Sequence, residues 1–248
     1  NYTFRSREFE QMELEFFIRP DEAIELQYGK VVTLADNPDL NGPVQDDWGW
    51  EVWHKYWVEQ RKKFLNAVGL PTSTFIEYWQ KPDELAHYAR ATVDIEYAFP
   101  FGVQELEGIA ARSDFDLTQH QIHSKVPQTV FDDPLKQACK KLTDDQKAAF
   151  IAKTQAEWIE RKQKALQAKA DAGALPGFAG LSDEEKAEIA AKAKTFCENL
   201  FDGKYIPHVI EPSAGVDRLM LALLCEAYEE QKLTDDKGKE DVRTVLHF

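Results

Sequence analysis

The sequence predicts an α+β fold in which an antiparallel sheet is flanked by helices and interrupted by a helical insertion. Two changes of composition predict this class. Residues 1–131 and 201–248 are rich in aromatic and β-branched residues in short alternating runs, as strands are. Residues 132–200 are dominated by Lys, Glu, Asp, Gln and Ala, which favour exposed helices. We therefore expect a core in two parts, 1–131 and 201–248, with the insertion 132–200 between them.

The first part of the core is expected to hold strands and one long helix. Polar and apolar side chains alternate over 3–17, as in a strand with one apolar face. Aromatic residues recur at helical spacing over 48–68, which predicts a helix whose aromatic stripe belongs to the core. Residues 91–99 and 103–111 alternate again around a Pro-Phe-Gly turn at 100–102, so we expect a hairpin there.

Two helices are expected in the insertion. Thr143 and Ser182 are each followed three residues later by Gln or Glu, which is the capping box of a helix start. The first helix should end at Gly173, because 174–180 contains one Pro and two Gly residues. We expect this helical hairpin to be a solvated spacer without catalytic residues.

The second part of the core should begin with a strand over 205–213 and continue as a helix over 216–230. Residues two apart in a strand point the same way, and polar residues share one face of three predicted strands. If those strands lie in one sheet, their polar faces form a floor that carries both charges. The residues are Arg5, Arg7, Phe9, Gln11, Glu13 and Glu15 in the first strand, Glu105 and Glu107 in 103–111, and Glu211 and Ser213 in 205–213.

Such a floor has definite chemical uses. Arginine forks bind phosphate oxygens, an aromatic ring stacks on a nucleobase, and a carboxylate cluster binds Mg²⁺ or a small ammonium group. The alternative is a set of cross-strand salt bridges on a solvated sheet face, and the pattern alone leaves both open. His120 and His123 near Asp114 and Asp116 could form a metal site, but no cysteine or HExxH helix supports it.

Charge and missing motifs exclude several classes. The formal net charge of −14 disfavours a stand-alone nucleic-acid binder with a broad basic face. Three cysteines without paired spacing indicate a reducing compartment rather than a disulfide scaffold. The longest purely apolar run, 219–225, is too short to span a bilayer, so we expect no membrane association. No P-loop, dinucleotide-binding or α/β-hydrolase motif occurs.

Several segments resemble the motifs of one enzyme family in the order in which that family carries them. The segment TFRSREFEQMELEFF at 3–17 resembles the second strand of motif 2 in glycyl-tRNA synthetases of the dimeric class II type. The segment VIEPSAGVDR at 209–218 resembles their motif 3. His87-Tyr88-Ala89 and the stretch from 105 to 117 resemble further blocks of the family. The resemblance covers 1–131 and 201–248 and implies an incomplete class II catalytic core, with the insertion either outside the family pattern or variable within it.

The resemblance implies roles for individual residues. Arg5 and Arg218 are implied as catalytic, Phe9 as a stacking partner of adenine, and Glu105 as a carboxylate that acts through Mg²⁺. The ATP-binding positions it implies are Phe4, Arg5, Ser6, Arg7, Glu8, Phe9, Glu105, Leu106, Gly215, Val216, Asp217 and Arg218. The glycine-binding positions it implies are Phe9, Glu10, Gln11, Met12, Glu13, Glu211, Pro212, Ser213, Ala214 and Gly215.

The same resemblance implies an activity. It is the ATP-dependent activation of glycine to glycyl-adenylate, followed by transfer of the glycyl group to tRNA(Gly), with ATP and Mg²⁺ required. A cytoplasmic homodimer is implied for the full-length enzyme. Because the sequence opens on Asn1 inside a strand-like pattern, we expect the chain to be a catalytic fragment from motif 2 to motif 3. The alternative is a non-catalytic paralogue or fragment that keeps the fold and binds ATP, glycine or a protein partner.

Overall fold

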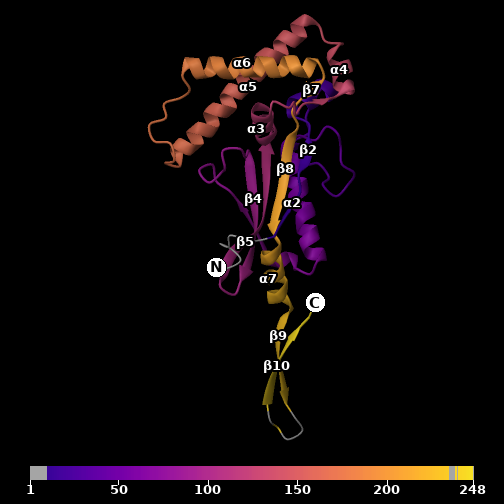
Figure 1. The fold of residues 1–248 in the computed structure, drawn as a ribbon, viewed down its shortest axis with the longest axis vertical. Coiled ribbons are helices and arrows are strands. Elements are labelled where there is room, and N and C mark those ends of the chain that lie inside the picture. Colours follow the sequence, from indigo (N-terminus) through magenta and orange to yellow (C-terminus); the bar gives the residue numbers. More distant parts are fainter. Residues whose placement is uncertain (1–9, 235–237, 239, 248) are drawn as a thin grey trace.

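The computed structural model describes residues 10–234, 238 and 240–247 and shows an α+β fold built on a six-stranded antiparallel sheet. The strands run in the order β1, β8, β5, β4 and β3, and β2 pairs with the other end of β8. The predicted fold class is therefore confirmed. The insertion lies across one end of the sheet, and a slender hairpin extends from the other (Figure 1). The sheet contains β1 (Gln11–Glu13), β2 (Phe16–Ile18), β3 (Phe75–Trp79), β4 (Ala91–Phe99), β5 (Gly102–Ser113) and β8 (His208–Gly215).

One face of the sheet packs against α2 (Trp50–Ala67), the helix predicted over 48–68. Val58 and Leu65 of α2 meet Val93 of β4 and Ile109 of β5 in one fully buried cluster. The predicted aromatic stripe of this helix joins the same core through half-buried tryptophans. Burial of one apolar face leaves the opposite face of the sheet for polar side chains.

The insertion consists of α4 (Asp133–Cys139), α5 (Asp144–Asp171) and α6 (Asp183–Phe201). The two long helices begin at the predicted capping boxes, where Thr143 and Ser182 accept hydrogen bonds from backbone N–H groups three residues later. The insertion packs on α1 (Asp21–Tyr28) through a second buried cluster. Its members are Ala23, Leu135, Cys139, Leu200 and Tyr205.

The two ends of the insertion meet. The short strands β6 (Val130–Phe131) and β7 (Lys204–Tyr205) pair with each other, and the Asp132 amide donates to the Gly203 carbonyl at 2.7 Å. Gly203 has φ +74°, and a Cβ there would lie 2.6 Å from the Asp132 carbonyl oxygen. Only a glycine fits this close approach, so the insertion leaves and re-enters the core at adjacent points.

Proline breaks two of the predicted strands. The described part of 3–17 forms β1 and β2, which run opposite β8 in one continuous register. The ladder is interrupted between them because Pro212 has no N–H to donate, although its carbonyl accepts from Leu14 at 3.0 Å. The predicted strand 205–213 is likewise divided, and Pro207 lies between β7 and β8.

The helix predicted over 216–230 is too long. The structure has α7 (Val216–Ala227), and β9 (Tyr228–Thr234) then pairs with β10 (Glu240–Leu246). Pairing with a distant segment overrides the local preference for helix. α3 (Phe115–Ser124) follows β5, and two short 3₁₀ helices cover Leu34–Asp36 and Thr72–Thr74.

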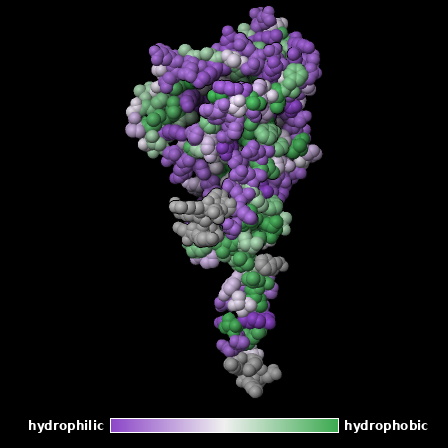
Figure 2. All heavy atoms as spheres, viewed as in Figure 1, coloured by the Kyte–Doolittle hydropathy of each residue, from purple (hydrophilic) through white to green (hydrophobic). Residues whose placement is uncertain are grey.

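The hydropathy of the surface changes along the length of the molecule. Figure 2 shows mostly hydrophilic residues around the insertion and many apolar residues around α7 and the β9–β10 hairpin. Met220 and Val242 are among the large apolar side chains exposed there. In the part of the chain that the structure describes, no helix is both long and apolar enough to cross a membrane.

Candidate functional site

The open face of the sheet brings together polar residues from four neighbouring strands. Ser213 of β8 lies opposite both Glu13 of β1 and Gly108 of β5, and Glu211 lies opposite Ala110. Directly opposite residues of antiparallel strands share a face, so these side chains stand on one floor. Gln11 belongs to it too, since its amide donates to the Ser213 hydroxyl. The structure thus places Gln11, Glu13, Glu211 and Ser213 together, as their alternation predicted.

The prediction that Glu105 and Glu107 share a face is wrong. Their partners in β4 are adjacent residues, so Leu106 is an extra residue, a β-bulge. The bulge leaves Glu105 on the open face and turns Glu107 toward α2. There the Glu107 carboxylate is fully buried and forms an ion pair with Arg61. Glu107 therefore belongs to the core and not to the floor.

Arg218 closes one end of the floor from the first turn of α7. Its guanidinium donates to the Glu105 backbone carbonyl at 3.1 Å and lies 3.3 Å from the Glu105 carboxylate. Gly215 is the N-cap of α7, and the helix N-terminus adds positive potential beside Arg218. The predicted ATP positions Glu105, Gly215 and Arg218 thus lie close together, and Val216 and Asp217 form the intervening turn.

Arg112 is a floor residue that sequence reasoning missed. It donates to Asp116 at 2.6 Å, forms an ion pair with Glu211, and lies over the Tyr88 ring at 4.1 Å. Burial lowers the pKa of Arg112, but the two carboxylates outweigh it and hold that pKa above its usual value. Extending the predicted strand 103–111 by one residue would have placed Arg112 on the face of Gly108 and Ala110.

Two carboxylates of the floor, Glu211 and Asp94, have raised pKa values. Burial raises the pKa of Glu211, and Glu13 and Glu15 raise it further, although the ion pair with Arg112 lowers it. Asp94 of β4 also lies on this face, opposite Gly108, and accepts from the Gln80 amide at 2.9 and 3.2 Å. Burial is the main cause of its raised pKa, and Glu105 contributes. Such a surface favours a cation or an ammonium group as its ligand.

Several predicted site residues occupy other positions. Met12 packs against the buried core, and Pro212 and Ala214 are buried on the side away from the floor. Leu106 is fully buried, so its side chain is not a ligand. The Glu10 side chain is exposed, and the Glu10 backbone carbonyl accepts from the Val216 amide at 2.9 Å. The predicted ATP residues Phe4, Arg5, Ser6, Arg7, Glu8 and Phe9 lie outside the described residues.

The described residues contain no group of three or more His, Cys, Asp or Glu side chains arranged to hold a metal ion. His120 and His123 on α3 therefore form no such group with the aspartates near them. Mg²⁺ commonly uses one or two protein carboxylates and completes its shell with phosphate oxygens and water. Glu105, half exposed at the end of the floor, fits that mode of binding beside a nucleotide.

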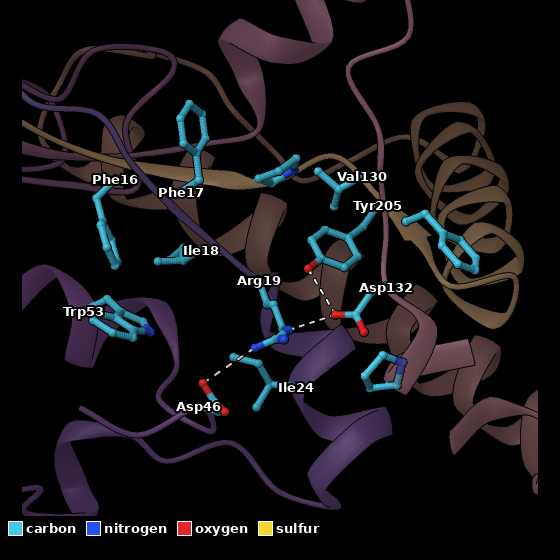
Figure 3. A pocket seen from close by; sticks show the side chains of 13 residues that line it. Phe16, Phe17, Ile18, Arg19, Ile24, Asp46, Trp53, Val130, Asp132 and Tyr205 are labelled. Carbon is cyan, nitrogen blue, oxygen red and sulfur yellow. Dashed lines mark hydrogen bonds and ion pairs between the residues drawn. The ribbon is translucent and has the colours of Figure 1, made fainter. Parts of the chain in front are cut away.

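A second hollow, of about 590 Å³, lies away from the floor, between β2, α1 and the ends of the insertion (Figure 3). Phe16, Phe17 and Trp53 line it. Asp132 at its wall accepts from Arg19 at 3.0 Å and from the Tyr205 hydroxyl at 3.3 Å. Asp132 also caps α4, so this polar cluster holds the insertion in place. Among the residues that the structure describes, none of those predicted to bind ATP or glycine lines this hollow.

The chain resembles one group of known proteins along its whole length, although no family model matches it. It is 32% identical over 252 residues to the glycine–tRNA ligase of Rhodopirellula baltica, covering 99% of this chain and 34% of that protein. It is 36% identical over 239 residues to that of Thermus thermophilus (96% and 32%) and 32% identical over 248 residues to that of Lysinibacillus sphaericus (100% and 33%). The resemblance to glycyl-tRNA synthetases is thus confirmed, and the chain spans about a third of the length of these relatives.

Proposed function

We propose that this chain is the part of a glycine–tRNA ligase that binds ATP and glycine and joins them as glycyl-adenylate, before the glycyl group passes to tRNA(Gly). One observation carries the proposal. Carboxylates from β1 and β8 stand around two small residues, Gly108 and Ala110, with Arg112 at one side and Arg218 at the end. The similarity to glycine–tRNA ligases over nearly the whole chain supports it independently.

Glycine offers an enzyme three features: an ammonium group, a carboxylate and the absence of a side chain. Glu13 of β1 and Glu211 of β8, with the hydroxyl of Ser213 on β8 beside them, would bind the ammonium group by charge-assisted hydrogen bonds. The Arg112 guanidinium is close enough to Glu211 to share that site and would receive the substrate carboxylate. A site built from such contacts binds a molecule that lacks the ammonium group more weakly, because Glu13 and Glu211 would lose that charge-assisted contact.

The nucleotide would lie at the other end of the floor. Arg218 would contact the ATP phosphates, and Glu105 would hold Mg²⁺ together with phosphate oxygens. The backbone at Leu106 would hold ATP as well. Mg²⁺ would supply charge neutralisation at the phosphates. We extend the proposal to Arg5 as a catalytic residue and to Phe9 as the stacking partner of adenine, on the resemblance of 3–17 to motif 2.

The proposed reaction balances in two steps. A glycine carboxylate oxygen attacks the α-phosphorus of ATP, and the bond to pyrophosphate breaks. The terminal ribose hydroxyl of tRNA(Gly) then attacks the glycyl carbonyl, and AMP leaves. Arginines that position both substrates and offset the charge of the phosphorane account for catalysis without a covalent enzyme intermediate. A homodimeric assembly and a cytoplasmic location belong to the same proposal and rest on the family resemblance.

Glycine-dependent exchange of pyrophosphate into ATP tests the proposal, measured on the complete gene product. Replacing Glu13 or Arg218 by Ala should lower the exchange rate about 100-fold or more, because each removes a charged contact to a substrate. Glu13→Ala should mainly raise the KM for glycine. Glu160→Ala on α5 and Arg243→Ala on β10 are matched controls that change charge away from the floor. Unchanged exchange in both site variants would refute the site assignment, and ATP binding without adenylate would favour a non-catalytic relative.

A further inference from the structure

A basic groove lies between the insertion and the sheet core, apart from the open face. Two adjoining cavities of about 420 and 510 Å³ share Arg90, Arg161 and Lys162 among their lining residues. α5 and α6 form one wall, and residues 82–90 with His208 form the other. In Figure 1 the two helices cross the end of the sheet at which β5 ends and α3 begins. The groove therefore exists because the insertion docks on the core.

The charge of this groove is opposite to that of the whole chain. Its lining contains the carboxylates of Glu22 and Asp114. Glu22 is buried, and its carboxylate already accepts a hydrogen bond from the Trp158 indole at 2.8 Å. Against these stand six cationic side chains in a chain of net charge −14. They are Arg90, Arg161, Lys162, Lys164, Lys169 and Lys192.

The cationic side chains of the insertion that line the groove form only weak ion pairs. Arg161 approaches Glu22 at 3.5 Å, and Lys164 and Lys192 pair with glutamates one turn away on their own helices. The exposed pairs of Lys164 and Lys192 contribute little to stability and exchange partners readily. These side chains can therefore turn to an anion in the groove at small cost.

Two buried polar atoms of the core wall have no hydrogen-bond partner among the described residues. They are the Arg90 Nη1 and the His208 Nδ1, and His208 is only 5% exposed. Burial, together with the neighbouring Arg90 and Arg161, holds the pKa of His208 well below its usual value. A neutral imidazole carries one N–H that can donate. Native proteins leave few such groups unpaired, so two of them at one cavity indicate a ligand with acceptor oxygens.

We propose that this groove is a binding site for a phosphate group. A phosphate offers several acceptor oxygens to the Arg90 fork, the His208 ring and the mobile cations of α5. The rings of Trp158 and Phe196, 5.1 Å apart, provide an apolar wall for the group that bears the phosphate. Free phosphate, a sugar phosphate and a single-stranded RNA backbone share this chemistry. The proposal uses no residue of the open face and stands independently of the function proposed above.

Calorimetric titration of the whole chain at constant ionic strength tests the proposal. The probes are inorganic phosphate, ribose 5-phosphate, ribose and a four-nucleotide RNA. The double variant Arg161→Gln/Lys162→Gln removes two cations of α5 while the buried Glu22 keeps its hydrogen bond from Trp158, and Lys186→Gln on α6 is the control outside the groove. Arg90→Gln is a second variant, checked for folding by circular dichroism.

Phosphate-bearing probes should bind the wild-type chain and Lys186→Gln equally and the double variant at least about 10-fold more weakly, while ribose should not bind. Tighter binding of RNA than of ribose 5-phosphate would identify a nucleic-acid backbone as the occupant. Equal binding of ribose 5-phosphate and phosphate would identify a small phosphate compound. No binding of any phosphate probe to the wild-type chain, or equal weakening by Lys186→Gln, would overturn the proposal.

Discussion

The buried ion pair between Arg61 and Glu107 yields a prediction that separates a core role for Glu107 from a role on the floor. The Glu107 side chain is fully buried and that of Arg61 is 16% exposed. Replacing Arg61 by Met would leave a carboxylate in the core without its counter-charge. Breaking one partner of such a pair costs about 3–5 kcal/mol of unfolding free energy. That is a large share of the roughly 5–15 kcal/mol that stabilises a typical domain.

Urea denaturation followed by circular dichroism measures the effect. With a slope of about 3 kcal/mol per molar urea, the midpoint should fall by about 1–1.7 M. Lys62→Met is the matched control one residue along α2. Lys62 pairs with Glu77 at 2.6 Å, both side chains are about a quarter exposed, and Lys55 also pairs with Glu77. That change should cost less than about 1 kcal/mol.

The double variant Arg61→Met/Glu107→Met completes the cycle. Because it removes the buried charge together with its partner, it should recover most of the stability lost in Arg61→Met. Two results would refute the reasoning. One is a cost for Arg61→Met no larger than that for Lys62→Met. The other is a double variant as unstable as the single one.

Three further predictions concern the fold and the insertion. Burial raises the pKa of Asp21 to about 6, above its unfolded value. The stability that the protonated Asp21 contributes is therefore full below about pH 4 and is lost as pH rises through 6. The unfolding free energy measured from about pH 4 to 7 should fall accordingly, and Asp21→Asn should remove this pH dependence. Gly203→Ala should cost more than about 3 kcal/mol of unfolding free energy, because its Cβ would meet the Asp132 carbonyl; Gly173→Ala, also at positive φ but with no atom within 4 Å, should cost about 1 kcal/mol, with both variants measured by thermal denaturation. Replacing 143–200 by a short Gly-Ser linker should lower the melting temperature and keep glycine-dependent exchange, since β6 and β7 close the gap; a folded variant without exchange would contradict this.

The sequence predicted what depends on near neighbours in the chain. Capping boxes at Thr143 and Ser182 determine helix starts within four residues, and the alternation of Glu211 and Ser213 fixes their common face without knowledge of the rest of the fold. These features need no information about tertiary packing, and they were confirmed.

Features that depend on distant partners were missed or misplaced. β3 was not predicted, because the charged Glu77 interrupts the apolar alternation of this short strand. Its pairing with Lys55 and Lys62 of α2 makes that position acceptable only in the folded structure. α7 ends where β9 begins to pair with β10, and the face on which Glu107 lies depends on the register of β5 against β4. The groove around Arg90 and His208 requires the insertion to fold back on the core, which local sequence does not encode.

The bulge at Leu106 has a consequence for how this site can vary among related chains. Leu106 pairs with no residue of the described strands β4 and β8, so its backbone N–H and C=O are released from the sheet ladder beside Glu105 and Arg218. Any contact made by those groups is independent of the side chain at 106, which serves the core. Substitutions at position 106 among related chains would therefore follow the packing of the core and would leave any such backbone contact intact. Deletion of residue 106 would instead return β5 to a regular ladder and remove any such contact. Glu105 would still lie on the open face and Glu107 on the face toward α2.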